Sequence, residues 1–218
     1  MIDSSDIFVF GSCRVIGPLK RLQLISKNSI VCHSCNEVTQ ILEVMKGNKT
    51  IPDNLIKRAF RYKERYEDIT NVEFLDNLKN SKIVIIEISS IKAIIHNNVY
   101  LSLAIRHNVG KPVSLDLATE YEKMTNHPLL KDKTIVLVPH CNVKLDNGCY
   151  IKNRQTIEHF VKNVAKCNAS IIPGEIITNI GLDKAMPEFE NGKRDVNHYS
   201  EDGIIAITDA FEALLNIL

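Results

Sequence analysis

The sequence alternates short apolar segments with stretches of helical periodicity, and this alternation most constrains the fold. The apolar segments are rich in Ile and Val, and we predict buried β-strands at 7–10, 29–32, 82–88 and 134–138. Strands that alternate with helices indicate an α/β domain with a mostly parallel sheet. The sequence therefore predicts helices on the sheet and a ligand site beyond the carboxyl ends of the strands.

The helical stretches are marked by apolar residues that recur every three or four positions. In the segment 36–45, NEVTQILEVM, four apolar side chains share one face, and Asn36 is a plausible N-cap. The last helix is expected to begin near Ser200, which is followed by Glu201 and Asp202 in the first turn. Further helices are predicted at 19–25, 52–65, 72–80 and 151–166.

The segment 92–105 departs from this pattern. Two apolar runs flank Asn97-Asn98, a pair that tolerates positive φ. We expect a β-hairpin here, inserted as a flap beyond the third strand. Because no internal repeat or linker is visible, residues 1–218 are predicted to form a single domain, which is either complete or part of a larger enzyme.

Charge and composition argue against two classes of partner. The 27 basic and 26 acidic side chains give a formal net charge of +1, without a basic run of five, so no nucleic-acid partner is expected. No apolar stretch approaches the roughly 18 residues of a membrane span, and the N-terminus lacks the basic start of a signal peptide. We therefore predict a cytoplasmic protein whose six cysteines are reduced thiols.

The first strand runs directly into Gly-Ser-Cys-Arg at 11–14. Gly11 allows a tight turn, and Cys13 follows where the turn leads into a helix. Backbone N–H groups and a helix N-terminus both favour a thiolate, so Cys13 is a candidate nucleophile. On this local sequence alone, Cys13 is equally well explained as a small apolar residue that fills a corner.

A second candidate block lies near the other end of the chain. Asp195 and His198 are three residues apart in a predicted loop just before the last helix. An Asp near a His can fix the imidazole tautomer and stabilise its cationic form. Taken alone, this segment is better explained as a solvated acidic loop with Ser200 as a cap.

Together the two blocks resemble the SGNH (GDSL-like) hydrolase superfamily, whose strand and helix order the chain follows over nearly its whole length. Gly11-Ser12-Cys13 lines up with the Gly-Asp-Ser block, so Cys13 takes the place of the nucleophilic serine, and Asp195 and His198 line up with the Asp-x-x-His block. The sequence looks most like the GSCFA branch, and it is similar to capsule-polysaccharide acetyltransferases with Gly-Asn-Cys-Gln at this place. The resemblance implies a three-layer α/β/α flavodoxin-like fold and a Cys-His-Asp triad.

The middle of the chain departs from the hydrolase pattern. Those hydrolases present a Gly after the second strand and Gly-x-Asn-Asp after the third, and both supply oxyanion donors. Here the corresponding stretches read His-Ser-Cys-Asn at 33–36 and Glu-Ile-Ser-Ser at 87–90. The oxyanion donors expected instead are side chains and backbone N–H groups at the strand ends: Asn36, Ser90, Arg14 and the turn at Cys13.

Acyl transfer is the favoured function, because thioester exchange suits a cysteine and the Gly-x-Asn-Asp block is missing. The Cys13 thiolate would attack acetyl-CoA, with His198 as the base and Asp195 as its orienter. The resemblance to capsule enzymes implies a sugar or nucleotide-sugar acceptor in polysaccharide biosynthesis, alongside other glycan-biosynthesis enzymes. Substrate or CoA contacts are expected from side chains near the strand ends and from scattered cations: Arg14, His33, Glu87, His140, Arg106, Lys111, Lys152 and Arg154.

Two alternatives remain open. An esterase or deacetylase would use the same triad with water as the acceptor. A metal-held, non-catalytic binding module is the other, because Cys32 and Cys35 form a C-x-x-C, and His140-Cys141 follows another strand. The two cysteines at 32 and 35 are more simply explained as buried apolar residues, and we assign no metal ligand.

Overall fold

The centre of the molecule is a five-stranded parallel sheet, in the order β2-β1-β3-β7-β8. The computed structural model describes residues 2–103, 105, 108–145 and 148–218. Counted within this sheet alone, the strand order is 2-1-3-4-5, as in flavodoxin-like folds. The strands are β1 (Ile7–Phe10), β2 (Ser29–Ile30), β3 (Ile83–Ile88), β7 (Thr134–Pro139) and β8 (Ala169–Ser170).

Side chains of the central strands alternate between the two faces of the sheet, and each face has its own core. In β1, Phe8 and Phe10 pack on one face, whereas Ile7 and Val9 pack on the other. All four side chains are fully buried. Burial on both faces explains why these strands are nearly continuous apolar runs in the sequence.

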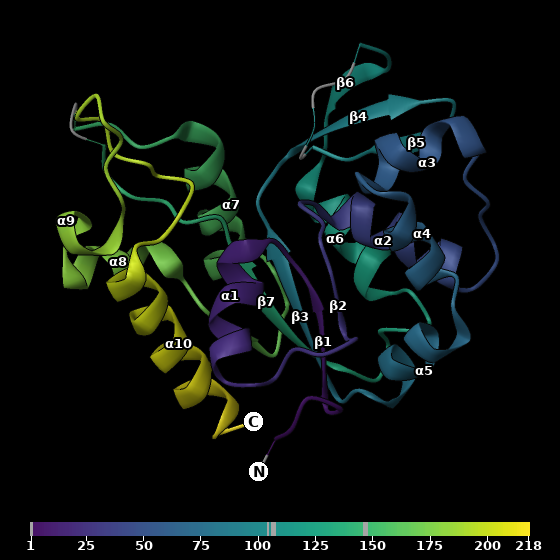
Figure 1. Cartoon of the computed structure of the whole chain (residues 1–218), viewed down its shortest axis with the longest axis horizontal. Helices are drawn as coiled ribbons and strands as arrows, with labels where there is room; N and C mark the ends of the chain where they lie inside the picture. The colour runs from purple at the N-terminus through teal and green to yellow at the C-terminus, as the bar shows by residue number, and fades with distance from the viewer. Residues whose placement is uncertain (1, 104, 106–107, 146–147) are drawn as a thin grey trace.

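Helices cover both faces, so the molecule has three layers (Figure 1). One layer consists of α1 (Cys13–Arg21), α8 (Pro173–Ile180), α9 (Leu182–Ala185) and α10 (Glu201–Leu215). The other consists of α2 (Cys35–Met45), α3 (Asp53–Phe60), α4 (Lys63–Ile69), α5 (Val72–Asn80), α6 (Leu117–Thr125) and α7 (Lys152–Asn163). The predicted α/β fold is confirmed. Within the described ranges, no helix is both long and apolar enough to cross a membrane.

The predicted hairpin is present, and it belongs to a second, antiparallel sheet in the order β5-β4-β6. Asn97 and Asn98 form its turn with φ angles of 49° and 59°, which are the left-handed values that a tight hairpin needs. The sequence does not predict the third strand, whose Pro112 is tolerated because that strand lies at an edge of the sheet. The three strands are β4 (Lys92–His96), β5 (Val99–Leu101) and β6 (Lys111–Ser114).

The first helix begins earlier than the sequence predicts, at Cys13 instead of residue 19. The Ser12 hydroxyl accepts a hydrogen bond from the N–H of Arg14 (3.4 Å) and caps the first turn. Pro18 lies inside the helix without ending it. Cys13 is therefore the first residue of α1, directly after the cap.

Two further predictions about helices are wrong. The single helix expected over 52–65 is interrupted, because Arg61 takes φ 68° between α3 and α4. The cap of α2 is Ser34, and Asn36 lies buried in the first turn of that helix. The cap of the last helix is as predicted, because the Ser200 hydroxyl accepts a hydrogen bond from the N–H of Gly203 (3.3 Å).

Candidate active site

The carboxyl ends of β1 and β3 lie against each other at Gly11 and Glu87. A Cβ on Gly11 would lie 3.3 Å from the Cβ of Glu87 and 3.2 Å from that of Val15, closer than ordinary contact. Gly11 is not among the residues with positive φ. Glycine is therefore favoured here by the close packing of Glu87 and Val15, and not by an unusual backbone angle.

Glu87 is 1% exposed and forms an ion pair with Arg14. Its Oε1 accepts hydrogen bonds from Nη2 (2.6 Å) and Nε (2.9 Å) of Arg14, and its Oε2 accepts one from the N–H of Ser12 (2.5 Å). Burial opposes the charge on Arg14, but Glu87 outweighs this effect and raises the pKa of Arg14. Two residues predicted to contact substrate are thus bound to each other.

His140 completes this cluster from the end of β7. Its Nε2 lies 2.8 Å from Nη1 of Arg14. Because a guanidinium can only donate, this His140 nitrogen accepts, and the ring proton belongs on Nδ1. Burial, followed by the charge of Arg14, lowers the pKa of His140 to about 2. His140 is therefore a neutral hydrogen-bond acceptor at this position.

Asp195 and His198 form a direct pair on the loop before α10. The Oδ2 of Asp195 lies 2.7 Å from Nδ1 of His198, and its Oδ1 accepts a hydrogen bond from the N–H of Asn197 (2.9 Å). Burial alone would raise the pKa of Asp195, but these hydrogen bonds outweigh it and lower that pKa. The His198 side chain is 61% exposed, so an ionised carboxylate orients an accessible imidazole.

Arg154 fixes this loop from within the molecule. It lies buried on α7 and donates hydrogen bonds to the carbonyl groups of Cys141 (3.0 Å) and Val196 (2.8 Å) and to Oδ1 of Asn197 (2.7 Å). The sequence suggested Arg154 as a contact for CoA, but its guanidinium is engaged by these loops. Arg154 lies three residues before the apolar Ile157, on the same face of the helix, and this spacing was the available sign that Arg154 is buried.

The two ends of the chain meet through Arg14 as well. Its Nη1 donates a hydrogen bond to the carbonyl of Asn197 (3.4 Å). Cys13 immediately precedes Arg14, and His198 immediately follows Asn197. Helices α1 and α10, which begin at these two blocks, also pack against each other (Figure 1). The segments that carry the predicted nucleophile and base are therefore neighbours at one edge of the sheet.

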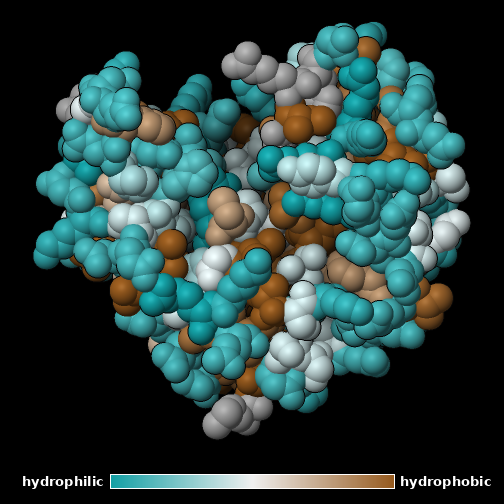
Figure 2. Space-filling model, viewed as in Figure 1, coloured by the Kyte–Doolittle hydropathy of each residue, from teal (hydrophilic) through white to brown (hydrophobic). Residues whose placement is uncertain are grey.

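A groove with a volume of about 480 Å³ begins at Ser12 and Cys13 and runs between α1 and α4. This volume is in the range of small-molecule sites. His33 also lines the groove, whereas Asn36 and Ser90 do not. Figure 2 shows apolar side chains gathered in the middle of this face of the molecule.

The remaining predicted contact residues have other surroundings. The Ser90 hydroxyl accepts a hydrogen bond from the N–H of Lys92 (2.9 Å) and donates one to its carbonyl (3.0 Å), at the start of β4. Both amide atoms of Asn36 are buried without a partner within the described ranges. Nδ1 of His33 lies 3.1 Å from the Ser89 hydroxyl, and burial lowers the pKa of this histidine. The suggested CoA contact Arg106 lies outside the described residues.

The three cysteines considered as metal ligands are buried thiols. Cys32, Cys35 and Cys141 are each at most 1% exposed. Burial raises the pKa of Cys35 and of Cys141 to about 12, which favours the protonated thiol. In the part of the chain that the structure describes, no three His, Cys, Asp or Glu side chains are grouped so that they could hold a metal ion.

The sequence did not point to Glu37, a buried carboxylate that joins the site to the segment that follows the hairpin. Its Oε2 accepts a hydrogen bond from the N–H of His33 (2.6 Å), and its Oε1 accepts one from the N–H of Leu103 (3.3 Å). Burial raises the pKa of Glu37 to about 7. A carboxylate in the first turn of a helix is common, so the sequence held no sign of this role.

The raised pKa makes stability depend on pH. Glu37 holds its proton more tightly when folded, with a pKa of about 7 against an ordinary 4.5, so its contribution is complete below pH 4.5 and is lost as pH rises through 7. The unfolding free energy of the wild-type protein should fall between pH 5 and pH 8. We expect this fall to be larger, by up to about 3 kcal/mol, than the fall in Glu37→Gln. Urea denaturation at both pH values measures this, and the exposed Glu64→Gln is the control. Parallel pH profiles for wild type and Glu37→Gln would contradict it.

The family model of the TviD N-terminal domain matches residues 5–127 and 116–208, which together span 5–208. The chain belongs to this family. The TviD N-terminal domain family relates the chain to polysaccharide biosynthesis. Cys13 lies in the first matched segment, and Asp195 and His198 lie in the second. No curated protein and no solved structure matches the chain.

Proposed function

We propose that this chain is an acyltransferase in which Cys13 is the nucleophile, His198 the general base and Asp195 the residue that orients it. The observation that carries the proposal is the 2.7 Å contact between Asp195 and His198, on a loop hydrogen-bonded to the residue next to Cys13. Membership of a family related to polysaccharide biosynthesis supports it. The flavodoxin-like strand order supports the resemblance to SGNH hydrolases, from which the triad is taken.

The proposed reaction has two steps. First, the Cys13 sulfur attacks the thioester carbonyl of an acyl-CoA, and the thiol proton passes to His198. The bond between the acyl carbon and the CoA sulfur then breaks, and CoA leaves as a thiol after it takes that proton from His198. Then a hydroxyl or amine of the acceptor attacks the acyl-cysteine, gives its proton to His198, and displaces the Cys13 thiolate. Cys13 is the first residue of α1, and the partial positive charge at a helix N-terminus favours this thiolate.

The backbone at this turn suggests where the oxyanion is stabilised. The N–H of Ser12 is bound by Glu87 and that of Arg14 by the Ser12 hydroxyl. In the part of the chain that the structure describes, the N–H of Cys13 has no partner and is the proposed donor. The side chains of Asn36, Ser90 and Arg14 stay predictions for the same role.

The substrates are proposed from the resemblance to capsule enzymes. The acyl group is acetyl, the donor is acetyl-CoA, and the acceptor is a hydroxyl or amine of a sugar or nucleotide sugar. Polysaccharide biosynthesis is consistent with small-molecule substrates of this kind.

Intact-mass spectrometry after incubation with acetyl-CoA tests the covalent step. We expect one acetyl group per wild-type chain, none on Cys13→Ala, and loss of the adduct when an amino sugar is added. Cys149→Ala is the matched control, because Cys149 is the other exposed cysteine among the described residues. Undiminished acylation or transfer by Cys13→Ala would remove Cys13 as the nucleophile.

Hydrolysis is a second candidate function, and the exposure of His198 favours it. With 61% of its side chain open to solvent, this base can activate water as well as a sugar. Release of CoA by the wild-type enzyme without any acceptor, at a rate that added sugars do not change, would assign hydrolysis. A rate that rises with the sugar concentration would assign transfer.

A further inference from the structure

The groove beside Cys13 carries cations that the protein does not neutralise. Lys20 of α1 lines one wall, and Arg61 and Arg65 line the opposite side. Within the described ranges, neither arginine pairs with a carboxylate. Instead, both guanidinium groups lie 5.1 Å from the ring centroid of Tyr62. The groove therefore combines net positive charge with a position next to the proposed nucleophile.

The two arginines lie close enough to affect each other. Burial, together with the charge of Arg61, lowers the pKa of Arg65. A guanidinium stays charged under such conditions, and two like charges without a counter-charge favour a bound anion. Arg14 and Arg154, which the sequence offered for an anion, are already held by protein groups. Among the described residues, the lysine and arginine side chains that line this groove are Lys20, Arg61 and Arg65, and no carboxylate pairs with them there.

The backbone at Arg61 is a second, independent observation. Its φ of 68° lies in the left-handed region, which is unfavourable for an arginine and which glycine adopts freely. A strained residue of this kind persists only where its surroundings over-determine it, and such residues cluster at ligand sites. Arg61 lines the groove, where a glycine would leave no donor.

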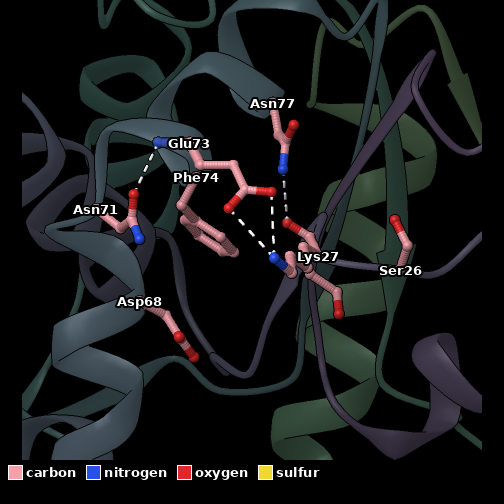
Figure 3. A pocket seen from close by; sticks show the side chains of 8 residues that line it. Ser26, Lys27, Asp68, Asn71, Glu73, Phe74 and Asn77 are labelled. Carbon is pink, nitrogen blue, oxygen red and sulfur yellow. Dashed lines mark hydrogen bonds and ion pairs between the residues drawn. The ribbon is translucent and has the colours of Figure 1, made fainter.

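The side of the groove that adjoins a second pocket carries an acidic residue. Ser26, Asp68 and Phe74 line both the groove and an adjoining pocket of about 230 Å³. Figure 3 shows that pocket, with an ion pair between Lys27 and Glu73 across it (3.2 Å). Asp68 lies one turn after Arg65 on α4, and its carboxylate repels an anion on the side that adjoins this pocket. An anionic group is therefore expected at the arginine end of the groove.

We propose that Arg61 and Arg65, with Lys20 opposite, form a subsite for a phosphate or carboxylate group of the substrate that reacts at Cys13. The inference rests on the proposed function, because it assigns a substrate group to the same site. Either a phosphate of CoA or of a nucleotide sugar, or the carboxylate of a hexuronate, has the required chemistry. A planar guanidinium pair binds such oxyanions through two or more charge-assisted hydrogen bonds.

Titration calorimetry on Cys13→Ala protein tests the subsite without turnover. The probes are acetyl-CoA, a uridine diphosphate hexose, glucuronate and glucose. We expect at least one anionic probe to bind and glucose to bind more weakly. Arg61→Gly and Arg65→Gln should each weaken the affinity for that anionic probe by about 10- to 100-fold. Arg65→Lys should have an intermediate effect on the affinity. The identity of the probe that responds distinguishes the donor from the acceptor.

Two controls keep the test specific. Lys57→Gln removes an exposed charge from α3 outside the groove and should leave binding within about twofold. Arg61→Gly should keep or raise the melting temperature, because glycine relieves the positive φ. Failure of every anionic probe to bind, or equal binding by all the arginine variants, overturns the subsite. Arginine-dependent binding without an acetyl adduct on Cys13 would instead leave the subsite in place and overturn the proposed function.

Discussion

Arg14→Met is expected to lower the free energy of unfolding by about 3–5 kcal/mol, because it leaves the Glu87 carboxylate buried without its counter-charge. Glu87 is 1% exposed, and the Arg14 side chain is 11% exposed. Water therefore cannot replace the two hydrogen bonds that Oε1 loses. The same substitution removes the donor to His140 and the link to Asn197. Urea denaturation of wild type and variant measures the loss.

Two further variants separate the buried pair from ordinary surface charge. Lys27→Met breaks a comparable ion pair with Glu73, but those side chains are 73% and 57% exposed, so a loss below about 1 kcal/mol is expected. The double variant Arg14→Met with Glu87→Leu should recover much of the loss, because no buried charge remains. If Arg14→Met costs no more than Lys27→Met, the pair does not contribute to stability as described.

The central strands were predictable because the residue types of each strand reflect its burial. The strands β1 and β3 are buried along their whole length, and β7 is buried after Thr134, so a nearly continuous apolar run in the sequence indicates that burial directly. The hairpin turn was predictable for a related reason, since Asn97 and Asn98 accept the left-handed backbone that the turn needs.

Other elements left no such local trace. The strand β8 consists of Ala169 and Ser170 alone, too short for any periodicity. The break at Arg61 was hidden because arginine is a good helix former, and nothing nearby in the sequence signals a positive φ. Elements of this kind are set by tertiary packing, which overrides local propensity.

The sequence predicted which residues lie in the candidate site, but not which hydrogen bonds and ion pairs they form with one another. The sequence identified Arg14, Glu87 and His140 separately, each as a contact for substrate. In the sheet, Phe10 pairs with Ile86, so Gly11 and Glu87 follow side by side, and the turn at Ser12 reaches the carboxylate. This pairing depends on the register of two strands more than 70 residues apart, and no local pattern encodes it.

His198→Ala is expected to lower kcat for acyl transfer by about 10²–10⁴-fold with little change in KM, because it removes the proposed base from the transition state. Asp195→Asn should give a loss in the same range, since an amide can hold the imidazole in the wrong tautomer and cannot stabilise its cation. Steady-state release of CoA in the presence of a sugar acceptor measures both. His159→Ala is the matched control, an exposed histidine on α7 that should leave kcat unchanged.

Stability and activity are expected to separate at this pair, in contrast to Arg14. The His198 side chain is 61% exposed, so its contact with Asp195 contributes no more than about 1 kcal/mol after screening by solvent. His198→Ala should therefore unfold at nearly the wild-type urea concentration while transfer collapses. A fall in stability that matches the fall in activity would assign the pair a structural role, and unchanged transfer in a stable variant would remove His198 as the base. Asp195 and Arg14 both form hydrogen bonds with Asn197 on this loop. If His198→Ala is stable and Arg14→Met is destabilised, then His198 takes part in the reaction, whereas Arg14 holds the two ends of the chain together.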